Sequence, residues 1–156
     1  MKKLIYAAAF TFLLASNAPA TIAGGAIQNA NVSHLVSSAA TPNKARFQGA
    51  SHRFEVHVQG KALSEIAIAI PDDLSISGGI EVKNQSNQKI ETQVSVNNQK
   101  ATVVFAQPVA PNTTISIHMR GIHTPGFSRN WGYALSGKLV GINAEIPLGR
   151  VGIQTY

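Results

Sequence analysis

The sequence predicts an all-β protein, an immunoglobulin-like β-sandwich of about 7–9 short antiparallel strands. Three observations predict it: short segments alternate apolar and polar residues, turn residues recur between these segments, and no long helical period appears after the first residues. Alternation with a period of two places apolar side chains on one face of a sheet. Two such sheets can therefore close over one shared core.

The clearest alternation lies in residues 101–120, ATVVFAQPVAPNTTISIHMR. Apolar residues recur at every second position in both halves of this stretch. Pro108 and Pro111, which lie between the halves, have no N–H to donate to a sheet. We expect a strand, a crossover between the two sheets and a second strand. The side chains predicted to face the core are Val103, Phe105, Ile115, Ile117 and Met119.

Other segments repeat this pattern between clusters of glycine, proline, asparagine and aspartate. The alternation predicts further strands at residues 51–58, 65–70, 80–83, 90–96, 133–139, 142–146 and 150–156. Residues 121–132 are expected to form the longest irregular loop.

The first residues have the pattern of a cleaved export signal. Lys2 and Lys3 precede an apolar run from Leu4 to Leu14, and Ala18-Pro19-Ala20 is a small-x-small cleavage sequence, with a second possible site at Ala23. The run is shorter than the roughly 20 residues that span a bilayer, and no later stretch is long enough. We expect an exported protein that lies in the periplasm, on the cell surface or outside the cell, with no membrane span after cleavage.

The predicted organisation follows from these patterns. Residues 1–20 are the signal peptide, residues 21–46 form a flexible or irregular N-terminal segment, and residues 47–156 form the sandwich domain. The segment 21–46 is rich in Ala, Ser, Asn and Thr, and it can alternatively lie on the domain as an irregular edge strand.

Charge and cysteine content exclude several classes of function. Without Lys2 and Lys3, eleven basic residues face seven acidic ones, a formal charge of +4, and no basic cluster of the kind that binds nucleic acid appears. Weak attraction to anionic polysaccharide or lipid head groups remains open. The chain has no cysteine, which excludes disulfides, thiolate metal sites and cysteine nucleophiles.

No catalytic motif is found, so no catalytic residue is predicted. The segment HTPGFSRNWGY, residues 123–133, gathers candidate ligand-binding side chains, because an aromatic ring beside polar groups can stack on a sugar or anchor a protein partner. The alternative is that its large aromatics cap one end of the core. The candidates are His123, Phe127, Arg129, Trp131 and Tyr133.

Two histidines are candidates for a metal site. His57 and His118 each lie on the predicted polar face of a strand, and they could bind a transition metal such as zinc or copper if those strands were neighbours. Solvated histidines are the alternative.

Four features follow one another along the chain from about His52: the strand motif RFEV at 53–56, a Pro-Asp-Asp turn, the bridge FAQPVAPNTT and the C-terminal LGRVGIQTY. In these features the chain resembles a family of small exported cyanobacterial proteins of unknown function. The resemblance covers about two-thirds of the chain. It implies export and an all-β domain, and it carries no catalytic residues.

Together these patterns predict an exported, non-enzymatic β-sandwich of the cell envelope or periplasm with a binding or assembly role. The expected partner is an unknown envelope protein or polysaccharide, self-association is possible, and no cofactor is expected. A carbohydrate-binding module that uses the 123–133 segment and a periplasmic metal-binding protein are the alternatives.

Overall fold

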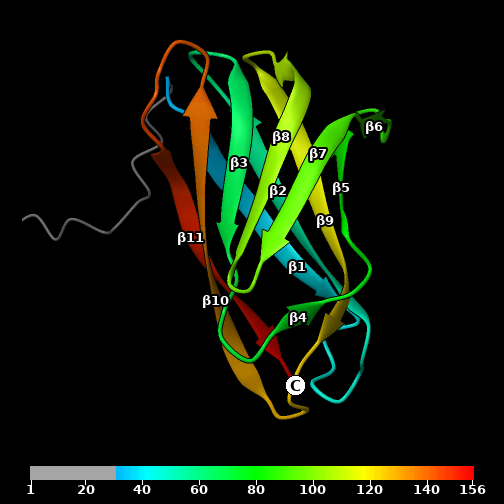
Figure 1. The fold of residues 1–156 in the computed structure, drawn as a ribbon. Coiled ribbons are helices and arrows are strands. Elements are labelled where there is room, and N and C mark those ends of the chain that lie inside the picture. Colours follow the sequence, from blue (N-terminus) through cyan, green and yellow to red (C-terminus); the bar gives the residue numbers. More distant parts are fainter. Residues whose placement is uncertain (1–30) are drawn as a thin grey trace, which may run out of the picture.

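The computed structural model describes residues 31–156, and the predicted signal peptide lies outside the described residues. Two antiparallel sheets pack face to face, as predicted (Figure 1). Sheet A has the order β1-β2-β9-β5-β6, with β4 also paired to β9, and sheet B has the order β11-β10-β3-β8-β7. Within the described residues no helix is long and apolar enough to span a membrane.

The strands of sheet A are β1 (His34–Thr41), β2 (Ala50–Val58), β4 (Ser75–Ile76), β5 (Ile80–Asn84), β6 (Lys89–Ile90) and β9 (Thr113–His123). The strands of sheet B are β3 (Leu63–Ala69), β7 (Thr92–Asn97), β8 (Lys100–Val109), β10 (Arg129–Leu139) and β11 (Ile146–Thr155).

The core lies between the sheets and consists of the alternate apolar residues of the long strands. The crossover predicted within residues 101–120 is confirmed, because β8 belongs to sheet B and β9 to sheet A. Asn112, at a φ of 62°, takes a backbone conformation that asparagine tolerates better than most residues, and it lies in the turn between these strands. The five side chains predicted to face the core from this stretch are all buried.

Three local predictions were wrong. The strand expected at 90–96 is divided, because Ile90 ends β6 in sheet A whereas Thr92 begins β7 in sheet B. Residues 142–145 form a loop rather than a strand, because the chain turns at Gly141, where the φ of 79° favours glycine, and the N–H of Ile142 donates to the carbonyl of Leu139. The loop expected at 121–132 is shorter than predicted. Strand β9 runs to His123 and β10 begins at Arg129, so only five residues, 124–128, separate the strands.

The sandwich domain was predicted to begin at Phe47, but the chain joins sheet A earlier. Residues 34–41 form β1 and pair with β2 along its length, with one irregularity between Leu35 and Ser37. The alternative of an edge strand is therefore the arrangement found for this part of the 21–46 segment.

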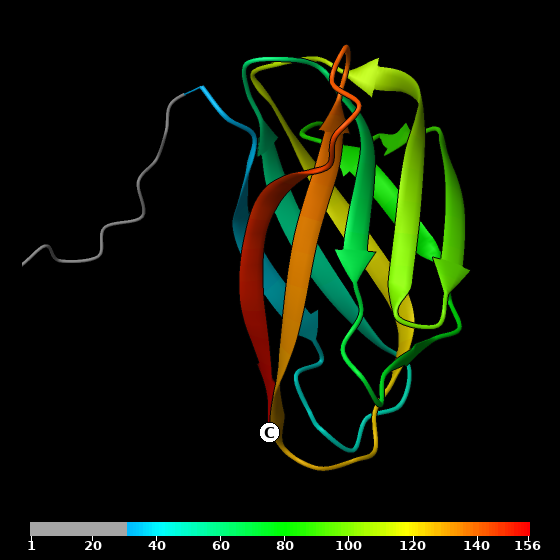
Figure 2. The same ribbon diagram turned by 60° about the vertical axis from the view of Figure 1, so that its left-hand side comes forward.

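One side of the sandwich is closed by two edge strands that lie side by side. Strand β1 of sheet A runs next to β11 of sheet B (Figure 2). A Cβ atom added at Gly149 of β11 would lie 2.9 Å from the Cβ of Leu35, so glycine permits this close approach. At the opposite side the edge strands are β6 of sheet A and β7 of sheet B. The valines of β7 are partly exposed there, Val94 by 38% and Val96 by 43%.

One hydrogen bond between side chains crosses the core from sheet to sheet. His52 of β2 and Tyr133 of β10 are both buried, and the Nδ1 atom of His52 lies 2.7 Å from the Tyr133 hydroxyl. The Nε2 atom of His52 is buried and has no hydrogen-bond partner among residues 31–156. Burial therefore lowers the pKa of His52 to about 4 and raises the pKa of Tyr133, because the charged form of each group loses its hydration.

The first prediction concerns acid stability. The pKa of His52 in the folded protein, about 4, lies below the ordinary histidine value of 6.5, so protonation of this histidine does not destabilise the fold above pH 6.5. The free energy of unfolding then falls as the pH drops from 6.5 towards 4, by about 3 kcal/mol at most. Denaturant unfolding at several pH values should show this slope in the wild type and a smaller slope in His52→Leu. Equal slopes in the two proteins would contradict it.

The second prediction concerns the hydroxyl of Tyr133. Tyr133→Phe leaves both ring nitrogens of the buried His52 without a protein partner, which should lower the free energy of unfolding near pH 7 by about 1–3 kcal/mol. Tyr156→Phe is the matched control, because the Tyr156 side chain is exposed and its hydroxyl is expected to contribute little. Equal stability of the two variants, measured by denaturant unfolding, would show that the buried hydrogen bond is unimportant.

Candidate functional site

The 123–133 segment places its two largest aromatic side chains in the core. Trp131 is fully buried and Tyr133 is 2% exposed. The Nε1 atom of Trp131 donates a hydrogen bond to the Oγ1 atom of Thr155 at 3.1 Å. Both residues belong to the inward-facing set of β10, because alternate residues of a strand point to the same face. This position agrees with the alternative interpretation of the segment, in which its large aromatic side chains cap one end of the core.

Two other candidates pack against Trp131 from outside the core. The guanidinium carbon of Arg129 lies 5.1 Å from the centre of the Trp131 ring, a cation–π distance, and its Nη1 atom lies 3.3 Å from the Oδ2 atom of Asp73. The Phe127 ring lies 6.3 Å from the Trp131 ring. Trp131 therefore has no free face for a sugar ring, whereas Phe127 remains 50% exposed.

The fifth candidate, His123, is held by neighbouring polar groups. Its Nε2 atom lies 3.0 Å from the hydroxyl of Ser77, and its Nδ1 atom lies 3.2 Å from the Oε1 atom of Gln48. These contacts link β9 to the two loops beside it. Both ring nitrogens of His123 are therefore engaged by side chains of the protein itself.

The exposed part of the segment lines a hollow together with the C-terminal residue Tyr156. Figure 1 shows that the C-terminus lies at one end of the sandwich. We call this hollow the end hollow, and it encloses about 620 Å³, a size within the range of small-molecule sites. Three stretches of chain contribute to it. Its lining residues are Lys44, Ala45, Arg46, Gly126, Phe127, Ser128 and Tyr156.

Backbone hydrogen bonds hold these three stretches together. The N–H of Ala45 donates to the carbonyl of Tyr156 at 2.6 Å, and the N–H of Tyr156 donates to the carbonyl of Asn43 at 2.9 Å. The hydroxyl of Thr124 donates to the carbonyl of Ala45 at 2.7 Å. The loop at 43–45 is thus held to the residues that directly follow β9 and β11.

The side chains of the end hollow combine aromatic rings with positive charge. Phe127 and Tyr156 are 50% and 72% exposed, and Lys44 and Arg46 are exposed beside them. Among the described residues that line the end hollow, none has an acidic side chain. Exposed rings offer flat apolar faces, and the two cations attract an anionic group.

Sequence reasoning identified only part of this hollow. Phe127 was a candidate, but Lys44, Arg46 and Tyr156 were not, because they lie far from residue 127 in the sequence. The available signal was compositional: aromatic residues are few in this chain, and Tyr156 occupies an outward position after the alternation of the last strand.

The structure places the two histidine candidates on neighbouring strands but in different positions. In the pairing of β2 with β9, His118 lies opposite Arg53 and His57 opposite Thr114. His57 contacts the Thr114 hydroxyl at 2.9 Å, and its ring lies 5.7 Å from that of His34 rather than beside His118.

The surroundings of His118 disfavour cations. Burial lowers the pKa of His118, and the nearby charges of Lys83, Arg53 and Arg120 lower it further, against the opposite effect of Glu81. The same positive charges would oppose a metal ion. Within the part of the chain that the structure describes, no three His, Asp or Glu side chains gather as metal ligands.

A second concave region covers the outer face of sheet B. Two adjoining hollows of about 590 and 630 Å³ share a floor at Ala69 and Ala134 and a rim at Arg150. At the opposite rim the Nζ atom of Lys100 donates to the Oε1 atom of Glu145 at 3.0 Å. This hydrogen bond holds the pKa of Glu145 below its usual range, with a further hydrogen bond from Ser136. Lys100 is thus already paired with a carboxylate.

Comparison with solved structures shows the fold. The N-terminal domain of the Streptococcus gordonii adhesin Sgo0707 matches with a TM-score of 0.55 at 14% identity, over 80% of this chain and 32% of that chain. The bacterial hydrophobin BslA matches with a TM-score of 0.56 at 10% identity, over 81% of this chain and 95% of that one. The present chain spans about a third of the adhesin chain that it matches.

A search of curated proteins finds no match. A family model does match residues 26–134, well over half of the chain. The match begins before the region of resemblance noted in the sequence, and it includes β1 and most of the strands of both sheets. The chain therefore belongs to the family described as "Protein of unknown function (DUF2808)".

Proposed function

We propose that this protein is an exported, non-enzymatic binding domain of the cell envelope or periplasm, and that its end hollow binds an acidic polysaccharide. The observation that carries the proposal is the pairing of two exposed aromatic rings with two exposed cations and no acidic side chain. The basic start and apolar run of residues 1–20 support export.

The chemistry of the hollow favours a charged sugar over a neutral one. A pyranose ring can lie against the exposed face of Phe127 or Tyr156, as sugars do on aromatic rings. Lys44 and Arg46 can then meet the carboxylate or sulfate group of the same sugar or of its neighbour, and guanidinium groups match carboxylate geometry well. Similar folds in an adhesin and a bacterial hydrophobin are compatible with a binding role at a bacterial surface.

The third prediction tests this assignment with a polyuronate. The chain without residues 1–20 should bind alginate in affinity electrophoresis and calorimetry, more weakly as salt is raised, and should bind neutral dextran much less. Arg46→Gln should weaken binding about twofold to fivefold, because exposed charge pairs contribute little individually. Phe127→Ala and Tyr156→Ser should each weaken it, and Tyr156→Phe, which keeps the ring, should not.

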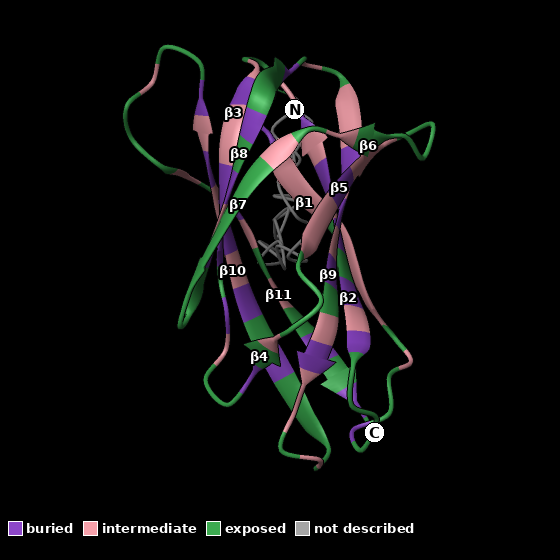
Figure 3. Cartoon of the chain, turned by 45° about the vertical axis from the view of Figure 1, so that its right-hand side comes forward, coloured by how far each residue is buried: buried purple, intermediate pink, exposed green. Residues whose placement is uncertain are grey.

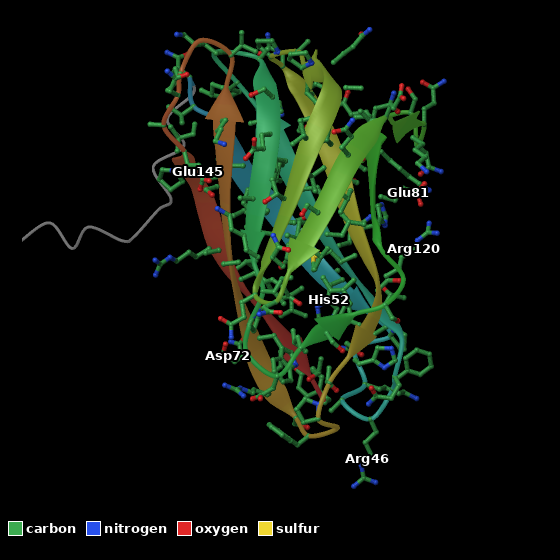
Figure 4. The ribbon with its side chains drawn as sticks, viewed as in Figure 1. Arg46, His52, Asp72, Glu81, Arg120 and Glu145 are labelled. Atoms are coloured by element: carbon green, nitrogen blue, oxygen red, sulfur yellow. The ribbon has the colours of Figure 1, made fainter. Side chains whose placement is uncertain are left out.

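The matched control is Arg150→Gln. It removes the same charge from the rim of the sheet B hollows, away from the end hollow. Figure 4 shows Arg46 at the lower end of the molecule and Glu145, the carboxylate paired with Lys100, on its upper flank. If Arg150→Gln lost alginate binding and Arg46→Gln kept it, the binding site would lie on sheet B. The absence of alginate binding at low salt would overturn the proposal.

A further inference from the structure

Strand β7 forms an edge of sheet B that carries exposed apolar side chains. Val94 and Val96 are 38% and 43% exposed, although they lie opposite the buried residues Val103 and Ala101 of β8 and so belong to the inner face. Figure 3 shows β7 as exposed along most of its length. The inner face of β7 therefore extends beyond the part of the core that sheet A covers.

Strand β7 also lacks the features that usually protect an edge strand. It is six residues long, TQVSVN, with no proline, no charged residue and no irregularity in its pairing with β8. The other edges are different within the described residues: β6 has two residues, and β1 and β11 lie side by side and each pair with an irregularity. The backbone groups on the free side of β7 are thus open to another strand.

The sequence of β7 is complementary to itself in one antiparallel register. With Ser95 opposite Ser95 of a second copy, Val94 lies opposite Val96 and Gln93 opposite Asn97. All four valines then share the inner face and the polar residues share the outer one. A shift of one residue would place valine against glutamine or serine. A shift of two would leave one valine of each copy opposite Thr92 or Asn98, so only the Ser95 register pairs every valine with a valine. No charge is brought into the paired segment.

We propose that two copies of this protein pair antiparallel through β7 and join their B sheets into one continuous sheet across a two-fold axis at Ser95. The occupant of the edge is a second copy because the strand matches itself in hydrogen bonding, in side-chain faces and in the absence of charge. The contact is limited to one short strand from each copy, so the dimer forms weakly and depends on concentration. This inference does not depend on the sugar-binding proposal.

The fourth prediction uses the absence of cysteine from the chain. In the proposed register the Cα atoms of the two Ser95 residues are about 4.5–5.5 Å apart, within the range of a disulfide. Ser95→Cys in the chain without residues 1–20 should therefore form disulfide-linked dimers under mild oxidation, seen on non-reducing gels. In the same register the two Cα atoms at position 93 are about 13 Å apart along the strands, so Gln93→Cys should not form a disulfide with itself. A mixture of Gln93→Cys and Asn97→Cys should link in heterodimers.

Sedimentation velocity over a range of concentrations supplies the second readout. The wild type should shift from monomer to dimer as its concentration rises, whereas Val94→Lys and Val96→Lys should remain monomeric. Both positions are exposed in the monomer, so folding is expected to survive, and Val104→Lys on the outer face of β8 is the control that should still dimerise. A wild type that is monomeric throughout, or Gln93→Cys that links as readily as Ser95→Cys, would overturn the proposal.

Discussion

The two sheets of this protein are held together by apolar side chains that meet in one shared core, because the chain has no cysteine and so no disulfide. Apolar burial has no direction, and the alternation along each strand decides which side chains enter this core. The hydrogen bond between His52 and Tyr133 adds a directional link between the layers. This link costs stability in acid, because the buried histidine resists protonation.

The demands of the core also decide which aromatic side chains are left for binding. Trp131 and Tyr133 occupy inward positions of β10, and their burial contributes to the core rather than to a surface. Arg129, which looked like a ligand-binding group in the sequence, packs on Trp131 and pairs with Asp73. The rings that remain exposed lie at the end of the sandwich, where strands stop and loops begin, so the candidate site lies there.

The sequence was sufficient to predict the layers, because period-two alternation is a local property that the strands of both sheets retain. It predicted the β8–β9 crossover from two prolines and placed the five core residues of that unit correctly. It failed at 142–146, where two isoleucines imitate alternation although Gly141 turns the chain. His52 was overlooked as a core residue, although it has the same parity as Phe54 in β2 and could have been recognised by this signal.

The candidate site could be predicted only in part, because three distant stretches of chain meet in the end hollow. Nothing local in residues 44–46 indicates that they lie against Phe127, and their contact depends on hydrogen bonds between the loop and the end of β11. The same holds for His57 and His118, which alternation places on one face but which the register keeps on different cross-strand pairs. Alternation in the sequence predicts the face of the sheet on which a side chain lies, whereas the register between strands decides which side chains are neighbours.

The proposed β7 pairing would also fix how the two end hollows of a dimer are oriented. A two-fold axis perpendicular to sheet B at Ser95 reverses the long axis of the sandwich in the second copy. The end hollow includes Tyr156 and so lies at one end of this long axis, the end where Figure 1 shows the C-terminus. The two end hollows of a β7-paired dimer would therefore face in opposite directions. Such a dimer could not place both hollows on adjacent sugars of one straight chain, so pairing would add little affinity for a single short chain. It would instead connect separate polysaccharide chains, which is a structural role as well as a binding one.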